Sequence, residues 1–332
     1  MTVALVTGAT GQDGSYLCER LAAEGVRVHA LVRAVTGPER DPGLDDLLRR
    51  TPDVVVHEGD LADGPALSDL LQQVAPDEVY NLAGISSVAY SWQEPALTGL
   101  LSGVAVASVL DGALRVQRAT GRPVRVVQAS SAEIFGDATE VPQNESTPVR
   151  PRSPYGAAKA YAHQMVGVSR SQGLHASSVI LYNHESPRRP LSFVTRKITH
   201  GVARIAAGLD TELTLGSTDV TRDWGWAPDY VEAMVLAARH DEPDDFVVAT
   251  GEPHTVADFV RAAFERAGVP DWADRVRTDP AFVRPAESTV QLGDATKAHQ
   301  VLGWQPTHRF SEVVAAMVDH DLALLTDDDG TR

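Results

Sequence analysis

The sequence of 332 residues predicts an α/β fold with a doubly wound parallel sheet at its centre. Short apolar segments alternate with helical segments through the first half, a pattern typical of parallel strands joined by helices. A glycine-spaced turn also joins the first strand to the first helix. The predicted strands are 3–7, 26–32, 54–58, 78–82, 124–129 and 176–181, and the predicted helices between them are 11–24, 44–50, 65–74, 95–118 and 154–172.

The first turn, between predicted strand 3–7 and helix 11–24, carries Gly8, Gly11 and Gly14. Glycines at this spacing let the backbone turn tightly and approach a pyrophosphate, which binds where free N–H groups point out of a helix N-terminus. A second strand follows the helix, as this motif requires. The pattern predicts a Rossmann-type dinucleotide site at the carboxyl edge of the sheet.

A second motif follows predicted strand 124–129, which ends near Ser131 and Glu133, while Tyr155 and Lys159 share a face of the next helix. A lysine ammonium beside a phenol stabilises the phenolate and lowers its pKa from about 10. A tyrosine tuned in this way can exchange protons near neutral pH. Ser131 can bond the same substrate oxygen, and Glu133 adds a second acid/base group. The motif predicts proton transfer at a sugar carbinol and at a neighbouring carbon.

The pattern changes after residue 181. Residues 183–189 read as a loop and 193–208 as a helix, followed by a short segment at 213–216, while 228–239 and 246–250 add one more helix and strand to the sheet. From residue 256 onward we predict short helices with loops. We therefore expect a dinucleotide-binding domain made of 1–182 and 227–250, and a smaller, discontinuous substrate-binding lobe made of 183–226 and 251–325.

Composition restricts the possible functions. The formal net charge of −16 argues against binding to nucleic acid or to an anionic membrane. We find no secretory signal and no run long enough to span a bilayer, and the most apolar stretch, 100–114, reads as a buried helix. Cys18 is the single cysteine, which excludes an internal disulfide and favours a core position in a cytoplasmic protein. We predict no metal site. Arginines in loops of the second half predict a bound anion, at Arg188, Arg189, Arg196, Arg222 and Arg284.

Longer strings extend these motifs over nearly the whole chain. They are TGQDGSY at 10–16, NHESPRR at 183–189, FVTRKI at 193–198, RDWG at 222–225 and RPAE at 284–287. With the glycine turn and the Tyr155/Lys159 pair, they make the sequence resemble the extended short-chain dehydrogenase/reductase family, and within it the GDP-mannose 4,6-dehydratases.

The resemblance implies a reaction in which NADP⁺ oxidises C4 of the mannose in GDP-mannose, water leaves across C5 and C6, and the hydride returns to C6. It implies that Tyr155 is the base for the C4 hydroxyl, that Lys159 holds the nicotinamide ribose and that Glu133 takes the C5 proton. Ser131 takes the family's Thr/Ser position. The implied cofactor contacts are Gly8, Thr10, Gly11, Gln12, Asp13, Gly14, Arg33, Asp60, Leu61, Leu82, Ala83, Ser86, Tyr155, Lys159, His184 and Arg189. The implied substrate contacts are Ser86, Asn183, Glu185, Lys197, Arg222, Arg284 and Glu287, of which the arginines suit the diphosphate.

Three positions depart from the family's pattern. Ala132 stands where the family usually has a hydroxyl residue, so the acid that expels the C6 hydroxyl is open, and Glu133 is a candidate for both steps. Arg33 is followed by Ala34 where the family has a second arginine. An acidic residue is absent there, which favours NADP over NAD. The loop after Arg33 differs from the family's, which helps join subunits, and this departure argues against a tetramer. We expect a homo-oligomer and leave dimer and tetramer open.

Two other functions are compatible with parts of the pattern. A nucleotide-sugar 4-reductase or epimerase on the same scaffold needs the Tyr155/Lys159 pair but no carboxylate for C5, so Glu133 argues against it. A regulator that senses the cofactor without catalysis would tolerate loss of Tyr155 or Lys159, and both are present.

Overall fold

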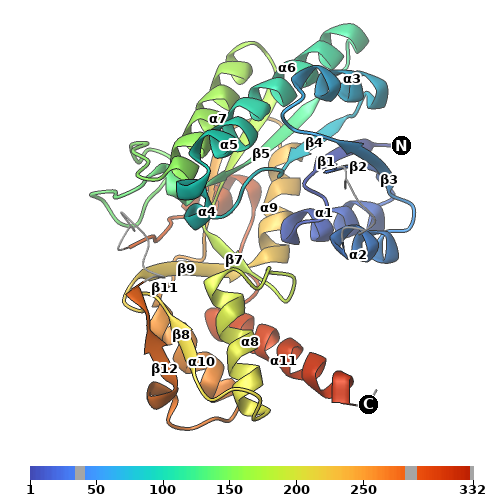
Figure 1. The fold of residues 1–332 in the computed structure, drawn as a ribbon. Helices are drawn as coiled ribbons and strands as arrows, with labels where there is room; N and C mark the ends of the chain where they lie inside the picture. Colours follow the sequence, from blue (N-terminus) through green and yellow to red (C-terminus); the bar gives the residue numbers. More distant parts are fainter. Residues whose placement is uncertain (34–41, 281–289, 330–332) are drawn as a thin grey trace.

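The computed structural model describes residues 1–33, 42–280 and 290–329 (Figure 1). Its centre is a seven-stranded parallel sheet with the order β10-β6-β5-β4-β1-β2-β3. The predicted doubly wound α/β fold is therefore confirmed, and each predicted strand matches an observed one within two residues at either end. The strands are β1 (Val3–Thr7), β2 (Arg27–Arg33), β3 (Val55–Gly59), β4 (Glu78–Asn81), β5 (Arg125–Ser131), β6 (His175–Leu181) and β10 (Asp245–Val248).

Helices cover both faces of this sheet (Figure 1). Alternate residues of a strand point to opposite faces, so the sheet has two separate apolar cores. Val6 of β1 belongs to one core and Leu5 to the other. Cys18 is fully buried in the first core, as predicted. The first core is closed by α1 (Gln12–Ala23), α2 (Pro42–Arg50) and α9 (Ala227–Arg239), and the second by α3 (Gly64–Val74), α6 (Ala105–Thr120) and α7 (Pro154–Ser171).

A continuous helical stretch at residues 95–120 packs beside α3 and α7. It consists of α5 (Pro95–Gly99), the π-helical turn η1 (Leu100–Val104) and α6, and it follows α4 (Val88–Gln93). By length and composition this stretch could cross a membrane, with a mean hydropathy of 1.7 in its most apolar window, so the prediction that no run is long enough was wrong. However, 56% of that window is buried inside the protein, so packing within the fold accounts for its apolar character.

A smaller lobe lies at the carboxyl edge of the sheet and has an apolar core of its own, with Trp224 and Phe259 fully buried. Two predictions were wrong in this region. A three-stranded sheet was missed because β9 buries the polar Arg222 and Asp223, and the last helix has 20 residues instead of being short. The elements are β7 (Asn183–Glu185), α8 (Val194–Ala206), β8 (Leu213–Leu215), β9 (Thr221–Trp226), β11 (Pro253–Thr255), α10 (Val256–Arg266), β12 (Val276–Thr278) and α11 (Phe310–Asp329).

Candidate active site

A cavity of about 770 Å³ lies where the carboxyl ends of the large sheet face the smaller lobe. Ligands of doubly wound sheets bind at this edge. The structure brings many of the predicted site residues to its walls from distant segments of the chain. They are Asp13, Leu82, Ser86, Ser131, Glu133, Tyr155, Lys159, Asn183, His184, Glu185, Arg189, Lys197 and Arg222. The predicted substrate residues Arg284 and Glu287 lie outside the described residues.

At Gly8, Gly11 and Gly14 the first turn has no side chains that would keep a ligand from its backbone. Gly8 has a φ of +72°, a conformation that favours glycine, and a Cβ on it would lie 2.9 Å from the Ala83 amide nitrogen. A Cβ on Gly14 would overlap the Gly8 carbonyl oxygen. Around Gly11, by contrast, a Cβ would meet only that oxygen among the described residues. Among the described residues no side chain caps the N-terminus of α1 after Gly11, so the first N–H groups of the helix can bind an anion. These residues fit a dinucleotide pyrophosphate.

Ser131, Glu133, Tyr155 and Lys159, the strand-end cluster, lie together at the end of β5 and the start of α7. Burial lowers the pKa of Lys159 to about 8, and its Nζ donates to the Ala129 carbonyl oxygen at 2.8 Å. Burial raises the pKa of Tyr155 to about 12, against the opposing effect of a hydrogen bond with Ser131. The prediction that Lys159 lowers the pKa of Tyr155 was therefore wrong for the chain alone, because the ammonium lies 5.8 Å from the ring centroid and turns to Ala129.

Glu133 stands on the short helix η2 (Ala132–Ile134), directly after β5. Its amide N–H is capped by Ser131 Oγ at 3.3 Å. Its Oε1 accepts a hydrogen bond from Gln291 Nε2 at 2.9 Å, and its Oε2 accepts a longer one from Ser153 Oγ at 3.4 Å. Both donors are neutral, and among the described residues no ion pair joins Glu133 to a cation. A carboxylate in this environment is available to accept a proton.

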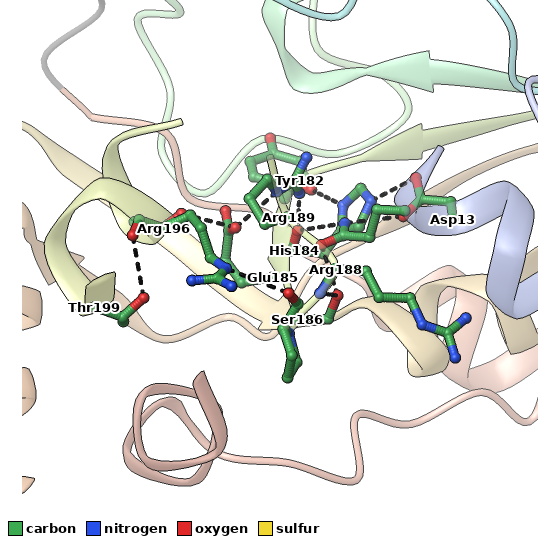
Figure 2. Close-up of polar contacts among 12 residues, drawn as sticks. Asp13, Tyr182, His184, Glu185, Ser186, Arg188, Arg189, Arg196 and Thr199 are labelled. Carbon is green, nitrogen blue, oxygen red and sulfur yellow. Dashed lines mark hydrogen bonds and ion pairs between the residues drawn. The ribbon is translucent and has the colours of Figure 1, made fainter. Parts of the chain in front are cut away.

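Asp13, His184, Glu185 and Arg189, the β7 cluster, line another wall of the cavity. Figure 2 shows polar contacts among these residues. His184 Nε2 is 2.9 Å from Asp13 Oδ2, and its Nδ1 is 2.7 Å from the Tyr182 carbonyl oxygen. Both partner atoms are hydrogen-bond acceptors, so the imidazole is held from both sides of the ring. Arg189 Nε donates to Glu185 Oε2 at 2.8 Å. Burial raises the pKa of Asp13, but the charges of His184 and Arg189 outweigh it and lower that pKa to about 2.

The predicted nucleotide contacts are spread along the same edge. Arg222 is buried in the cavity wall at 6% exposure, and its Nη1 donates to the Thr221 carbonyl oxygen at 2.8 Å. Arg33 ends β2 as an exposed side chain outside the cavity. Asp60 and Leu61 follow β3, where Asp60 Oδ1 accepts the Ala62 N–H at 2.9 Å. Thr10, Gly11 and Gln12 line a second hollow of about 500 Å³.

Besides Arg189, which pairs with Glu185, two more of the arginines predicted to bind an anion are held by carboxylates of the chain. Arg188 Nη2 lies 2.8 Å from Glu19 Oε1, with its guanidinium 3.7 Å from the Tyr16 ring centroid. Figure 2 shows this side chain directed away from the β7 cluster. Arg196 pairs with the fully buried Asp321 of α11. These two arginines therefore join elements of the fold.

Sequence reasoning missed several parts of the cavity wall, and two of these lie directly beside predicted site residues. One is α4 with the residues before it, which contribute Ser87, Val88, Ala89, Trp92 and Gln93. Ser87 caps this helix by accepting the Tyr90 N–H at 3.1 Å, and a serine before an apolar turn was a readable signal. The other part is Gln291, which no local pattern marks because its role depends on a contact 158 positions away.

Comparison with known proteins identifies the family of this chain. A family model described as GDP-mannose 4,6 dehydratase matches residues 5–317. The chain belongs to this family. It is 44% identical to GDP-mannose 4,6 dehydratase 1 of Arabidopsis thaliana, with 97% of the chain and 90% of that protein covered. It is 41% identical to the human GDP-mannose 4,6 dehydratase, with 97% and 92% covered. Proteins with this name are hydro-lyases.

Solved structures share the fold. A UDP-glucose 4-epimerase of Thermotoga maritima, solved with UDP-glucose, has a TM-score of 0.85 at 23% identity, with 98% of this chain and all of that chain covered. A Thermus thermophilus UDP-glucose 4-epimerase in complex with NAD has a TM-score of 0.79 at 27% identity, with 96% and 99% covered. RMD of Pseudomonas aeruginosa, complexed with NADPH, has a TM-score of 0.78 at 23% identity, with 98% and 100% covered. These neighbours thus include proteins that bind nicotinamide dinucleotides of both kinds.

Proposed function

We propose that this chain converts GDP-mannose to GDP-4-keto-6-deoxy-mannose by removing one water. The observation that carries the proposal is the position of Glu133 beside Tyr155 and Lys159 in one cavity, with neutral donors on its carboxylate. A reductase or epimerase needs the tyrosine and lysine alone. A dehydratase must also remove a proton from a carbon atom, and a further carboxylate serves as the base for that step.

The order of the chemistry follows from acidity. A ketone at C4 makes the C5 proton acidic, so a carboxylate can remove it. Glu133 Oε2 takes this proton, the C–H electrons form the C5=C6 double bond, and the C6 hydroxyl leaves with a proton as water. A bound nicotinamide dinucleotide would supply the hydride acceptor for C4 and the hydride donor for C6. The proton that C5 regains balances the proton taken from the C4 hydroxyl, so the net change is the loss of one water.

The strand-end cluster provides the groups for the first step. Tyr155 accepts the proton of the C4 hydroxyl, and Ser131 holds the same oxygen. Because burial raises the pKa of Tyr155 to about 12 in the chain alone, its activation requires added positive charge beside the phenol. Lys159 contributes to this and holds the nicotinamide ribose. We assign Glu133 to the C5 proton and, since Ala132 has no hydroxyl, also to delivery of a proton to the leaving C6 oxygen.

We propose that the smaller lobe, made of 183–226 and 251–325, holds the nucleotide sugar, and that 1–182 with 227–250 holds the cofactor. Arg222 and Arg284 bind the diphosphate, and the other substrate contacts are Ser86, Asn183, Glu185, Lys197 and Glu287. The burial of Arg222 in the cavity wall supports this division. The glycine turn and the residues after β3 and β4 hold the dinucleotide.

We propose NADP as the cofactor, with NAD bound more weakly, because β2 ends in Arg33 instead of an acidic residue. A guanidinium at this strand end suits the 2′-phosphate that distinguishes the two dinucleotides. Nucleic acid and membranes are not expected partners of a chain with a net charge of −16. The single, buried Cys18 supports a cytoplasmic location.

We propose that the protein is a homo-oligomer. Apolar side chains stay exposed on neighbouring helices of one face, where a second copy would cover them. Leu97 of α5 is 37% exposed, Val104 of η1 is 52% exposed and Tyr161 of α7 is 46% exposed, and these elements pack against one another. The proposal leaves dimer and tetramer open.

Incubation with GDP-mannose tests the proposed function. Purified protein loaded with NADP⁺ is expected to produce the 4-keto-6-deoxy sugar, seen as the loss of one water by mass analysis, without net consumption of cofactor. UDP-glucose is the matched control, because an epimerase would act on such a substrate without loss of water. GDP-mannose left unchanged while another sugar nucleotide turns over would overturn the proposal.

A further inference from the structure

Gln291 is the residue that holds Glu133 in place. Its Nε2 donates to Glu133 Oε1 at 2.9 Å, and its side chain is only 3% exposed although it lines the cavity. This contact joins two segments 158 positions apart. Among the described residues, the other carboxylate oxygen, Oε2, has a single hydrogen bond, the longer one from Ser153 Oγ at 3.4 Å. One oxygen of Glu133 is therefore held more closely than the other.

The backbone around Gln291 is held from both sides. The Gln291 N–H donates to the Thr221 carbonyl oxygen of β9 at 3.1 Å, and the Leu292 carbonyl oxygen accepts the Gln143 N–H at 2.8 Å. Gly293 packs so closely that a Cβ there would lie 2.8 Å from the Tyr182 ring. These contacts fix the backbone that carries the amide, so the direction from which it reaches Glu133 is set by the fold.

The chemistry of the amide differs from that of the other partners in this cavity. Glu185 lies in the same cavity wall and pairs with the Arg189 guanidinium, which is a cation, and Asp13 lies against the His184 imidazole. A cation stabilises the carboxylate strongly and makes it a poor base, whereas a neutral N–H orients it and stabilises it less. Gln291 thus provides a donor that fixes Glu133 without removing its ability to take a proton.

We propose that Gln291 is a positioning residue for the elimination step: its amide fixes Oε1 of Glu133 and presents Oε2 to the C5 proton. This rests on the proposed function, since it assigns Gln291 a part in the same reaction. Gln291 acts through Glu133 and has no bond to make or break itself. Loss of the Gln291 amide is therefore expected to slow the elimination more than the C4 oxidation that precedes it.

Substitution of Gln291 separates this role from a structural one. In Gln291→Leu, which keeps the volume and removes the donor, dehydration is expected to slow at least about tenfold, because the base is no longer held in position. The 4-keto sugar that still has its C6 hydroxyl then accumulates, and carbonyl trapping with mass analysis detects it. The acid limb of the pH–rate profile moves to higher pH, since the lost hydrogen bond favoured the carboxylate form. Gln291→Glu, which brings a second carboxylate, moves this limb further.

Gln117→Leu is the matched control. This glutamine lies on α6 outside the cavity, where Nε2 donates to the Gly173 carbonyl oxygen at 2.9 Å and Oε1 accepts the Val124 N–H at 3.2 Å. The same side-chain change there should leave the rate of dehydration and its pH profile as in the wild-type protein. Thermal unfolding of all variants shows whether the fold is kept.

The outcomes separate the two proposals. Dehydration at the wild-type rate in Gln291→Leu overturns the positioning role and leaves the proposed function intact. The positioning role is also overturned if Gln291→Leu lowers the melting temperature, slows C4 oxidation and dehydration equally, and leaves the acid limb of the pH–rate profile unmoved. Gln291 would then have a structural role. A wild-type protein that forms no dehydrated product from GDP-mannose overturns the proposed function, and the positioning role with it.

Discussion

The strand-end cluster and the β7 cluster face the same cavity. They differ in whether a buried ionisable group has a partner of opposite charge. In the strand-end cluster, burial lowers the pKa of Lys159 to about 8 and raises that of Tyr155 to about 12. In the β7 cluster, burial also acts on Asp13, yet cationic partners lower its pKa to about 2 (Figure 2). Burial alone therefore does not decide how a group titrates. A neighbouring opposite charge also matters, and it separates the paired groups of the β7 cluster from the groups proposed to exchange protons.

The largest effect is expected from removing one partner of the Glu185–Arg189 ion pair in the β7 cluster. Glu185→Gln leaves the guanidinium of Arg189 facing a neutral amide in a site where Glu185 is 3% exposed. Removal of one partner of a buried ion pair is expected to lower the free energy of unfolding by about 3 kcal/mol. Urea unfolding at pH 7 measures this. The double variant Glu185→Gln/Arg189→Met is the control, and it should be destabilised by less than the sum of the single changes. A loss below about 1 kcal/mol would show that solvent already screens the pair.

The same substitution in the strand-end cluster should act on chemistry and leave stability nearly unchanged. Glu133→Gln keeps the size of the side chain and loses the base, so turnover of GDP-mannose should fall at least about a hundredfold. Binding of GDP-mannose, measured by calorimetry, should remain close to that of the wild-type protein. Near-normal turnover would mean that another residue takes the C5 proton.

Substrate binding tests the division between the two lobes. Arg222→Met should weaken GDP-mannose binding by about ten- to a hundredfold, since a charge-assisted bond to a phosphate oxygen is worth about 1.5–3 kcal/mol. Cofactor affinity should change little. Arg33→Ala is the matched variant on the large sheet, and it should lower NADP affinity while GDP-mannose binding is kept. If Arg222→Met lowers only the melting temperature, Arg222 is structural.

The two clusters also differ in how far the sequence predicts them. Tyr155, Lys159, Ser131 and Glu133 lie in local patterns, a strand end and a helix face, so their convergence follows from the α/β fold. The rise in the pKa of Tyr155 could not be read from spacing, because it comes from burial, and the ammonium of Lys159 is directed toward Ala129. Gln291 could not be predicted at all, since its contact with Glu133 depends on how a distant segment packs beside β9.

The smallest expected effect is a gain in stability instead of a loss, and it distinguishes the two clusters most clearly. The pKa of Lys159 falls from 10.5 to about 8, which corresponds to a cost of about 3 kcal/mol for keeping the buried ammonium charged at pH 7. Lys159→Met removes this cost and loses the hydrogen bond to Ala129, worth about 1 kcal/mol. The cofactor-free variant should therefore be about 2 kcal/mol more stable than the wild-type protein at pH 7.

This gain in stability depends on pH. Below pH 8 the lysine is charged in both the folded and unfolded states, and the full cost of burying the charge applies. Between about pH 8 and 10.5 the folded state loses its proton first, so the stability of the wild-type protein rises with pH. The advantage of the variant should therefore shrink and disappear by about pH 10, as measured by urea unfolding of both proteins at each pH. A variant that is less stable than wild type at pH 7 would show that the ammonium is compensated in the same way as the β7 cluster, and the contrast between the two clusters would fail.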